Sequence, residues 1–183
     1  MPKFKTSQLF TTIILHVNFM HVTSNMLLFA LVSSYLEHKY GTIRIVFVSV
    51  ISGVGGALFS AAFGNPCEVV VGASGMIFGL VGVWMADLVV AFDTIEFVYM
   101  RIILATAFFI YEIVAFATAQ HVSIFSHLGG LICGFFPGCC FLPSAGHRKV
   151  EAFIPFAGIL VTVAIFTSLP AYIYSDRRYN VSC

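Results

Sequence analysis

The chain has 183 residues, of which 60% are hydrophobic and only 9% are charged, and its formal net charge is +1. A soluble domain carries about 25% charged residues, so the composition excludes one and predicts an all-α protein embedded in a lipid bilayer. The near-neutral charge, without a run of basic residues, also excludes a nucleic-acid-binding surface.

Six apolar segments follow one another along the chain, each near the roughly 20 residues that a helix needs to cross a bilayer. We expect transmembrane helices at Gln8–Leu36, Ile43–Phe63, Val69–Val90, Phe97–Ala119, Ile124–Leu142 and Phe153–Tyr174. The connections between them are short and leave no room for a soluble domain. The predicted fold is a polytopic helical bundle with about six transmembrane helices.

Basic residues in the loops orient these spans. The loops after spans one, three and five contain Lys or Arg, whereas the loops after spans two and four contain neither. Because basic loops stay in the cytosol, spans one, three and five are expected to start on the lumenal or extracellular side. The basic residues assigned to these loops and to the span ends that adjoin them are Lys39, Arg44, Arg101, Arg148 and Lys149.

The first span contains a cluster of polar residues. His21 and Asn25 are one helical turn apart, at i and i+4, so they share one face of the helix. His16 comes five residues before His21, about 140° around the same helix. We therefore expect His16 to be a neighbouring support and not a direct participant in a site.

A serine flanked by glycines, in Gly72-Ala73-Ser74-Gly75, opens the third span, and His127 stands near the start of the fifth. At a rise of about 1.5 Å per residue, Ser74 and His127 both lie within roughly 10 Å of the lumenal interface. His21 is in the same half of its span. The three side chains can therefore meet at one depth of the membrane.

Glycines on both of these spans follow helical spacing. Gly75, Gly79 and Gly82 recur along span three, and Gly130 and Gly134 follow the histidine of span five. Such stripes of small residues usually serve only to pack helices closely. Here the same close packing would bring a serine and a histidine within hydrogen-bonding reach.

A serine next to a histidine is the minimal arrangement for acyl transfer. A neutral imidazole accepts the hydroxyl proton, and preorganised donors stabilise the oxyanion that forms. A lone histidine inside a bundle is more often a structural hydrogen-bonding residue, but here all the parts occur together on one side. Glu112 is the only acid that could approach this depth, so we expect a Ser-His dyad and no metal or cofactor.

Three motifs resemble the signatures of the rhomboid intramembrane serine proteases. They are His16-x4-His21-x3-Asn25, Gly72-Ala73-Ser74-Gly75 and Ser126-His127-Leu128-Gly129-Gly130-x3-Gly134. They stand in the family's order on alternating spans. The resemblance implies Ser74 as nucleophile and His127 as general base and acid. It also implies an oxyanion hole made of His21, Asn25 and the Ser74 backbone N–H, with His16 and Gly72 in support.

The resemblance covers about Leu9 to Pro143, which suggests three parts: a short polar N-terminus (1–8), a rhomboid-like protease core (9–143), and a C-terminal part (144–183). The last part would hold a cytosolic loop, an extra transmembrane helix and a short tail, as in the eukaryotic secretase-like branch. Family members begin with a further helix and a long lumenal loop, and we expect this chain to lack both. The residue before the family's catalytic histidine is usually Ala, where this chain has Ser126.

The expected activity is therefore that of a serine endopeptidase that cleaves transmembrane segments of single-span membrane proteins. A multi-pass protein of the secretory pathway or plasma membrane is favoured over a mitochondrial one. The alternative is a catalytically inactive rhomboid-like protein that binds transmembrane clients. A transporter or channel would predict inverted repeats or broken helices, and the sequence contains no internal repeat.

Overall fold

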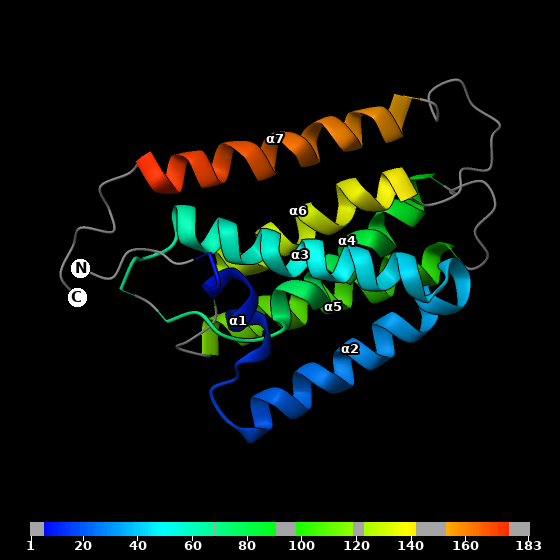
Figure 1. The fold of residues 1–183 in the computed structure, drawn as a ribbon. Coiled ribbons are helices and arrows are strands. Elements are labelled where there is room, and N and C mark those ends of the chain that lie inside the picture. The colour runs from blue at the N-terminus through cyan, green and yellow to red at the C-terminus, as the bar shows by residue number, and fades with distance from the viewer. Residues whose placement is uncertain (1–5, 68, 91–97, 119–122, 142–152, 176–183) are drawn as a thin grey trace.

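The computed structural model describes residues 6–67, 69–90, 98–118, 123–141 and 153–175. Over these residues the chain forms seven helices and no strand, which confirms the all-α prediction (Figure 1). The helices are α1 (Gln8–Ile14), α2 (Phe19–Tyr40), α3 (Thr42–Phe63), α4 (Ser74–Val90), α5 (Val98–Thr118), α6 (Ile124–Phe141) and α7 (Phe153–Ser175).

Four of the described helices, α2, α3, α6 and α7, are long and apolar enough to cross a membrane. Helix α4 has 17 residues, about 26 Å at the usual rise, and the apolar stretch of α5 is shorter still at Tyr99–Ile110. Since α4 packs against α2, α3 and α6, it lies inside the bundle. An enclosed helix needs less length than one that faces lipid.

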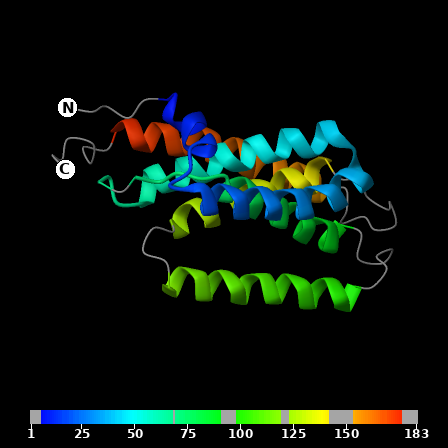
Figure 2. The same ribbon diagram turned by 90° about the horizontal axis from the view of Figure 1, so that it is seen from below.

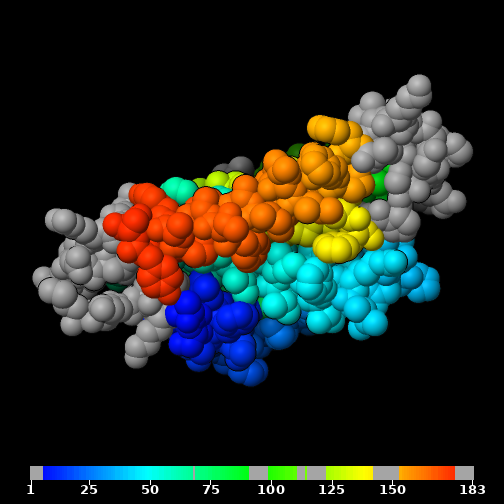
Figure 3. Space-filling view, turned by 45° about the horizontal axis from the view of Figure 1, so that its top comes forward, coloured from blue at the N-terminus to red at the C-terminus, as the bar shows by residue number. Residues whose placement is uncertain are grey.

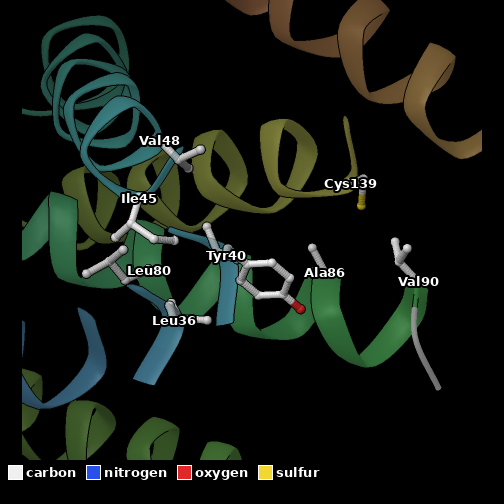
Figure 4. Packing of buried hydrophobic residues seen from close by; sticks show 9 residues of the cluster. Leu36, Tyr40, Ile45, Val48, Leu80, Ala86, Val90 and Cys139 are labelled. Carbon is white, nitrogen blue, oxygen red and sulfur yellow. The ribbon is translucent and has the colours of Figure 1, made fainter. Parts of the chain in front are cut away.

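Most of α4 is buried, and a hydrophobic cluster forms around its second half. In Figure 4 side chains of α2, α3 and α6 surround the α4 residues from several sides. The labelled members of the cluster are Leu36, Tyr40, Ile45, Val48, Leu80, Ala86, Val90 and Cys139.

Glycines set the distance between α4 and α6. A Cβ atom placed on Gly130 would overlap the carbonyl of Gly75, and one on Gly134 would overlap the carbonyl of Gly79. The backbones of the two helices are therefore in direct contact over two turns. Close approach of this kind is what small residues permit in lipid, where packing and not hydrophobicity drives association.

The two remaining long helices lie at the periphery. Helix α7 packs on α6 and α3 and covers one face of the molecule (Figure 3). Helix α5 is the outermost helix on the opposite side, set apart from the others in Figure 2. Its described contacts include a ring contact between Phe108 and Phe78, with centroids 5.3 Å apart, and an ion pair between Arg101 and Asp87.

Two predicted helix boundaries are wrong. The first predicted span, Gln8–Leu36, is two helices, because the backbone is extended at Leu15 and Asn18. The Asn18 side chain then caps α2 by accepting the His21 backbone N–H at 2.8 Å. The third span was expected to begin at Val69. The segment before Ser74 is not helical, and Gly72 has a φ of +131°, which ordinary residues avoid.

Candidate active site

The first turns of α2 carry His21 and Asn25, one above the other. Asn25 is buried, with 6% of its surface exposed. Its Nδ2 has no hydrogen-bond partner among the described residues. A buried amide without a partner costs about 1–3 kcal/mol, so this donor is a candidate for binding something that is not part of the chain.

His21 and Asn25 both face the turn that leads into α4. A Cβ atom placed on Gly72 would lie 2.9 Å from Cε1 of His21 and 3.3 Å from Nδ2 of Asn25. The missing side chain of Gly72 therefore leaves the space that these two groups occupy. The sequence predicted that His21 and Asn25 share a helical face, and in the structure this face is turned toward Gly72.

Ser74 is the first residue of α4 and is half-buried. One turn further along, Phe78 stacks on the ring of His127 from α6, with centroids 4.1 Å apart and an interplanar angle of 19°. Because residues at i and i+4 lie on the same face of a helix, His127 lies over the face of α4 that carries Ser74.

His16 is not on the same helix as His21, so the predicted 140° separation does not apply. It lies in the linker between α1 and α2, and its ring meets that of His21 edge to face, with centroids 5.2 Å apart. Its Nδ1 lies 2.9 Å from the carbonyl oxygen of Ile14. Its Nε2 accepts the backbone N–H of Ala73 at 3.4 Å.

A cavity of about 450 Å³ adjoins this cluster. It lies between α1, α3 and the segment that precedes α4, and its wall includes Gly72, Gly75 and Ser126. Hydroxyl and amide side chains from Thr11, Thr12, Ser60 and Asn65 make part of the lining polar. The site therefore adjoins a space that can hold water or a side chain of a bound segment.

Acidic residues do not join the described part of the site. Glu112 belongs to α5, but its side chain lies outside the described residues. Asp87, 1% exposed, lies toward the other end of α4, where it pairs with Lys39 and Arg101. Among the described residues no group of three or more His, Cys, Asp and Glu side chains could hold a metal ion.

Sequence reasoning missed two parts of the cluster. Phe78, which holds the ring of His127, could have been found from its i+4 spacing to Ser74. The backbone carbonyl of Thr12, which accepts the Gly72 N–H at 2.8 Å, leaves no trace in a sequence, because every residue carries a carbonyl.

The fold and this cluster define a polytopic membrane protein with polar groups gathered at one end of a helical bundle. The Rhomboid domain family matches residues 3–144 of the chain. The chain belongs to the rhomboid family.

Individual relatives agree with this assignment. The chain is 39% identical over 147 residues to RHOMBOID-like protein 1 of Arabidopsis thaliana, a match that covers 79% of this chain and 37% of that protein. It is 26% identical to Rhomboid-like protease 1 of Toxoplasma gondii over 90% of this chain and 56% of the relative. Inactive rhomboid protein 1 of Danio rerio is 24% identical over 88% of this chain and 19% of the relative. The chain thus spans well under half the length of its Arabidopsis relative.

Proposed function

We propose that the protein is an intramembrane serine endopeptidase with Ser74 as nucleophile and His127 as general base. The observation that carries the proposal is the buried Nδ2 of Asn25, which has no hydrogen-bond partner in the described part of the chain and faces the turn leading into Ser74. A buried amide donor that is left open near the turn before the nucleophile is what an oxyanion hole requires before substrate binds. A purely structural bundle would gain stability by pairing or removing it.

The chemistry follows from these positions. The Ser74 oxygen attacks the carbonyl carbon of a peptide bond while His127 takes the hydroxyl proton. The Asn25 amide, His21 and the Ser74 backbone N–H stabilise the oxyanion. His127 then returns the proton to the leaving amine, which leaves an acyl-enzyme, and a water activated by His127 hydrolyses that ester to restore Ser74.

The substrates proposed are transmembrane segments of single-span proteins, cut near their lumenal end. A peptide bond within a helix has its backbone groups paired, so the segment must unwind locally before a serine can reach it. Segments containing Gly, Ala or Pro near the cut should therefore be preferred. The disulfide-bonded Cys67, in the segment between α3 and α4, supports an oxidising and hence lumenal or extracellular side for the site.

Labelling with a serine-reactive fluorophosphonate, together with cleavage of a single-span reporter in liposomes, tests this function. We expect the wild-type protein to label and to cleave, and Ser74→Ala to do neither while inserting normally. Ser126→Ala is the matched control, because Ser126 packs beside Gly75 and the family usually has alanine at this position. It should label like the wild type.

The test also separates the proposal from its alternative. A wild-type protein that binds the reporter but neither labels nor cleaves it would be a client-binding rhomboid without catalytic activity. Labelling that persists in Ser74→Ala would place the nucleophile elsewhere and overturn the assignment.

A further inference from the structure

The turn that precedes Ser74 is held from outside its own helix. Ala73 is the N-cap of α4, since its carbonyl accepts the N–H groups of Met76 and Ile77 at 2.9 and 3.2 Å. The N–H groups of Gly72 and Ala73 point away from the helix and need other partners. The position of these two residues determines where the first turn of α4, and with it Ser74, is placed.

Both N–H groups find their partners in the segment Thr12–His16, the end of α1 and the linker that follows it. Gly72 donates to the Thr12 carbonyl at 2.8 Å, and Ala73 donates to Nε2 of His16 at 3.4 Å. Helix α1 is itself fixed, because Ile13 fills the space beside Gly53 of α3. The linker thus connects a fixed helix to the turn before the serine.

The hydrogen bonds of His16 select one tautomer. The Ile14 carbonyl can only accept, so Nδ1, which lies 2.9 Å from it, carries the ring proton. Nε2 is then free of a proton and can accept from Ala73. In the other tautomer, the Ile14 carbonyl would face an unprotonated Nδ1, and the proton on Nε2 would face the N–H of Ala73. A charged ring, with a proton on both nitrogens, would also lose the hydrogen bond from Ala73.

We infer that His16 is a positioning residue: in the tautomer protonated on Nδ1 it accepts the Ala73 N–H and, together with the Thr12 carbonyl, fixes the turn from which Ser74 projects. The inference rests on the proposed function. His16 acts through the backbone and takes no proton in the reaction, because both of its ring nitrogens are already bonded.

Two substitutions of His16 test this role. His16→Ala removes the acceptor, and His16→Gln replaces the ring with a side chain whose carbonyl can accept from Ala73. We expect His16→Ala to lower kcat and the rate of fluorophosphonate labelling by about 10- to 100-fold, the scale of a small misplacement of a reacting group, with KM nearly unchanged. His16→Gln should recover part of the loss. His38→Ala, an exposed histidine near the C-terminal end of α2, is the control and should behave as wild type.

Each outcome decides the inference. A wild-type labelling rate in His16→Ala would overturn it. It would also be overturned if His16→Ala and His16→Gln lost activity and unfolding midpoint to the same extent, because His16 would then be needed only for folding. The nitrogen-15 spectrum of the His16 ring provides a readout independent of activity. A proton on Nδ1 supports the inference, and a proton on Nε2 overturns it. If the wild-type protein proves inactive, only the proposed function fails, because this spectrum does not depend on activity.

Discussion

At the level of single residues, two asparagines near the start of α2 have different tasks. Asn25 is buried, and its Nδ2 finds no hydrogen-bond partner among the residues that the structure describes, whereas the exposed Asn18 caps the helix by accepting the His21 backbone N–H. We expect Asn25→Ala to lower kcat by about 10- to 1000-fold, near the range for losing one oxyanion donor, and to leave KM nearly unchanged because that charge develops only in the transition state.

Asn18→Ala is the comparison. Loss of an N-cap costs about 1 kcal/mol of stability, so the unfolding midpoint should fall while kcat changes far less than in Asn25→Ala. Turnover and substrate affinity measured on the same reporter separate the two effects. A rise in KM at constant kcat in Asn25→Ala would make Asn25 a binding residue.

Two glycines with positive φ offer a second comparison. Gly72, at φ +131°, has no room for a side chain, since a Cβ would lie 2.9 Å from the ring of His21. Gly41, at φ +86° between α2 and α3, has nothing within 4 Å of the same position. Alanine at either position strains the backbone by about 1–3 kcal/mol.

Only Gly72→Ala should also displace His21 from the site. We therefore expect both variants to lose thermal stability, but only Gly72→Ala to lose fluorophosphonate labelling at temperatures where it remains folded. Equal labelling by the two variants would show that the contact between Gly72 and His21 has no part in activity.

At the level of helices, α5 is held by a charged cluster toward the end of the bundle opposite Ser74. Asp87 of α4 is 1% exposed and accepts from Lys39 at 2.8 Å and from Arg101 of α5 at 3.0 Å. The Tyr40 hydroxyl also donates to it. One carboxylate thus connects α2, α4 and α5.

Asp87→Asn should destabilise the protein more than Arg101→Met. Removing one partner of a buried pair costs about 3–5 kcal/mol, and the partial exposure of Lys39 and Arg101 reduces the expected loss to about 1–2 kcal/mol. In Arg101→Met the carboxylate keeps Lys39 and Tyr40. Both variants should raise hydrogen exchange in α5 relative to α3, and unchanged exchange in α5 would mean that the ion pair does not hold this helix.

Helix boundaries show what the sequence could and could not predict at this level. Hydrophobicity predicted the apolar segments, because the bilayer imposes their length. Hydrophobicity missed the break between α1 and α2, since residues 8–15 are as apolar as a membrane span. The break depends on the capping hydrogen bond of Asn18, which competes with continuation of the helix. Hydrophobicity also extended the third span to Val69, because a non-helical run of valines before Gly72 has the same hydropathy as a helix.

At the level of the whole molecule, the sequence predicted a candidate set of site residues, and their catalytic roles stay a prediction; how these residues lie relative to one another could not be predicted. The motifs placed a serine and histidines on alternating spans, and an alternating topology brings the starts of such spans to one side. The role of His16 depended on a tautomer and a backbone bond to Ala73, which a helical wheel cannot represent. The contact of His127 with Phe78 likewise depended on how closely the glycines let α4 and α6 approach.

The orientation of the whole bundle in the membrane remains a prediction. The connection after α3 contains no basic residue and includes the disulfide-bonded Cys67, whereas Lys39 and Arg101 meet toward the other end of the bundle. Basic residues are retained in the cytosol and disulfides form outside it. Both observations favour a lumenal or extracellular side for the Ser74 end.

Glycosylation tags in microsomes test this orientation. A tag inserted near Gly64 should be modified, and the same tag near Gly146, outside the described residues, should not. Both tagged proteins should carry Asn180→Gln, because Asn180-Val181-Ser182 is itself an acceptor sequence. A tag whose acceptor asparagine is replaced by glutamine marks the position of the unmodified band. The reverse pattern would turn Ser74 and His127 toward the cytosolic leaflet. Substrates would then have to be cut at their cytosolic ends. The inference that the basic loops are cytosolic and the inference that Cys67 is lumenal or extracellular would both be wrong.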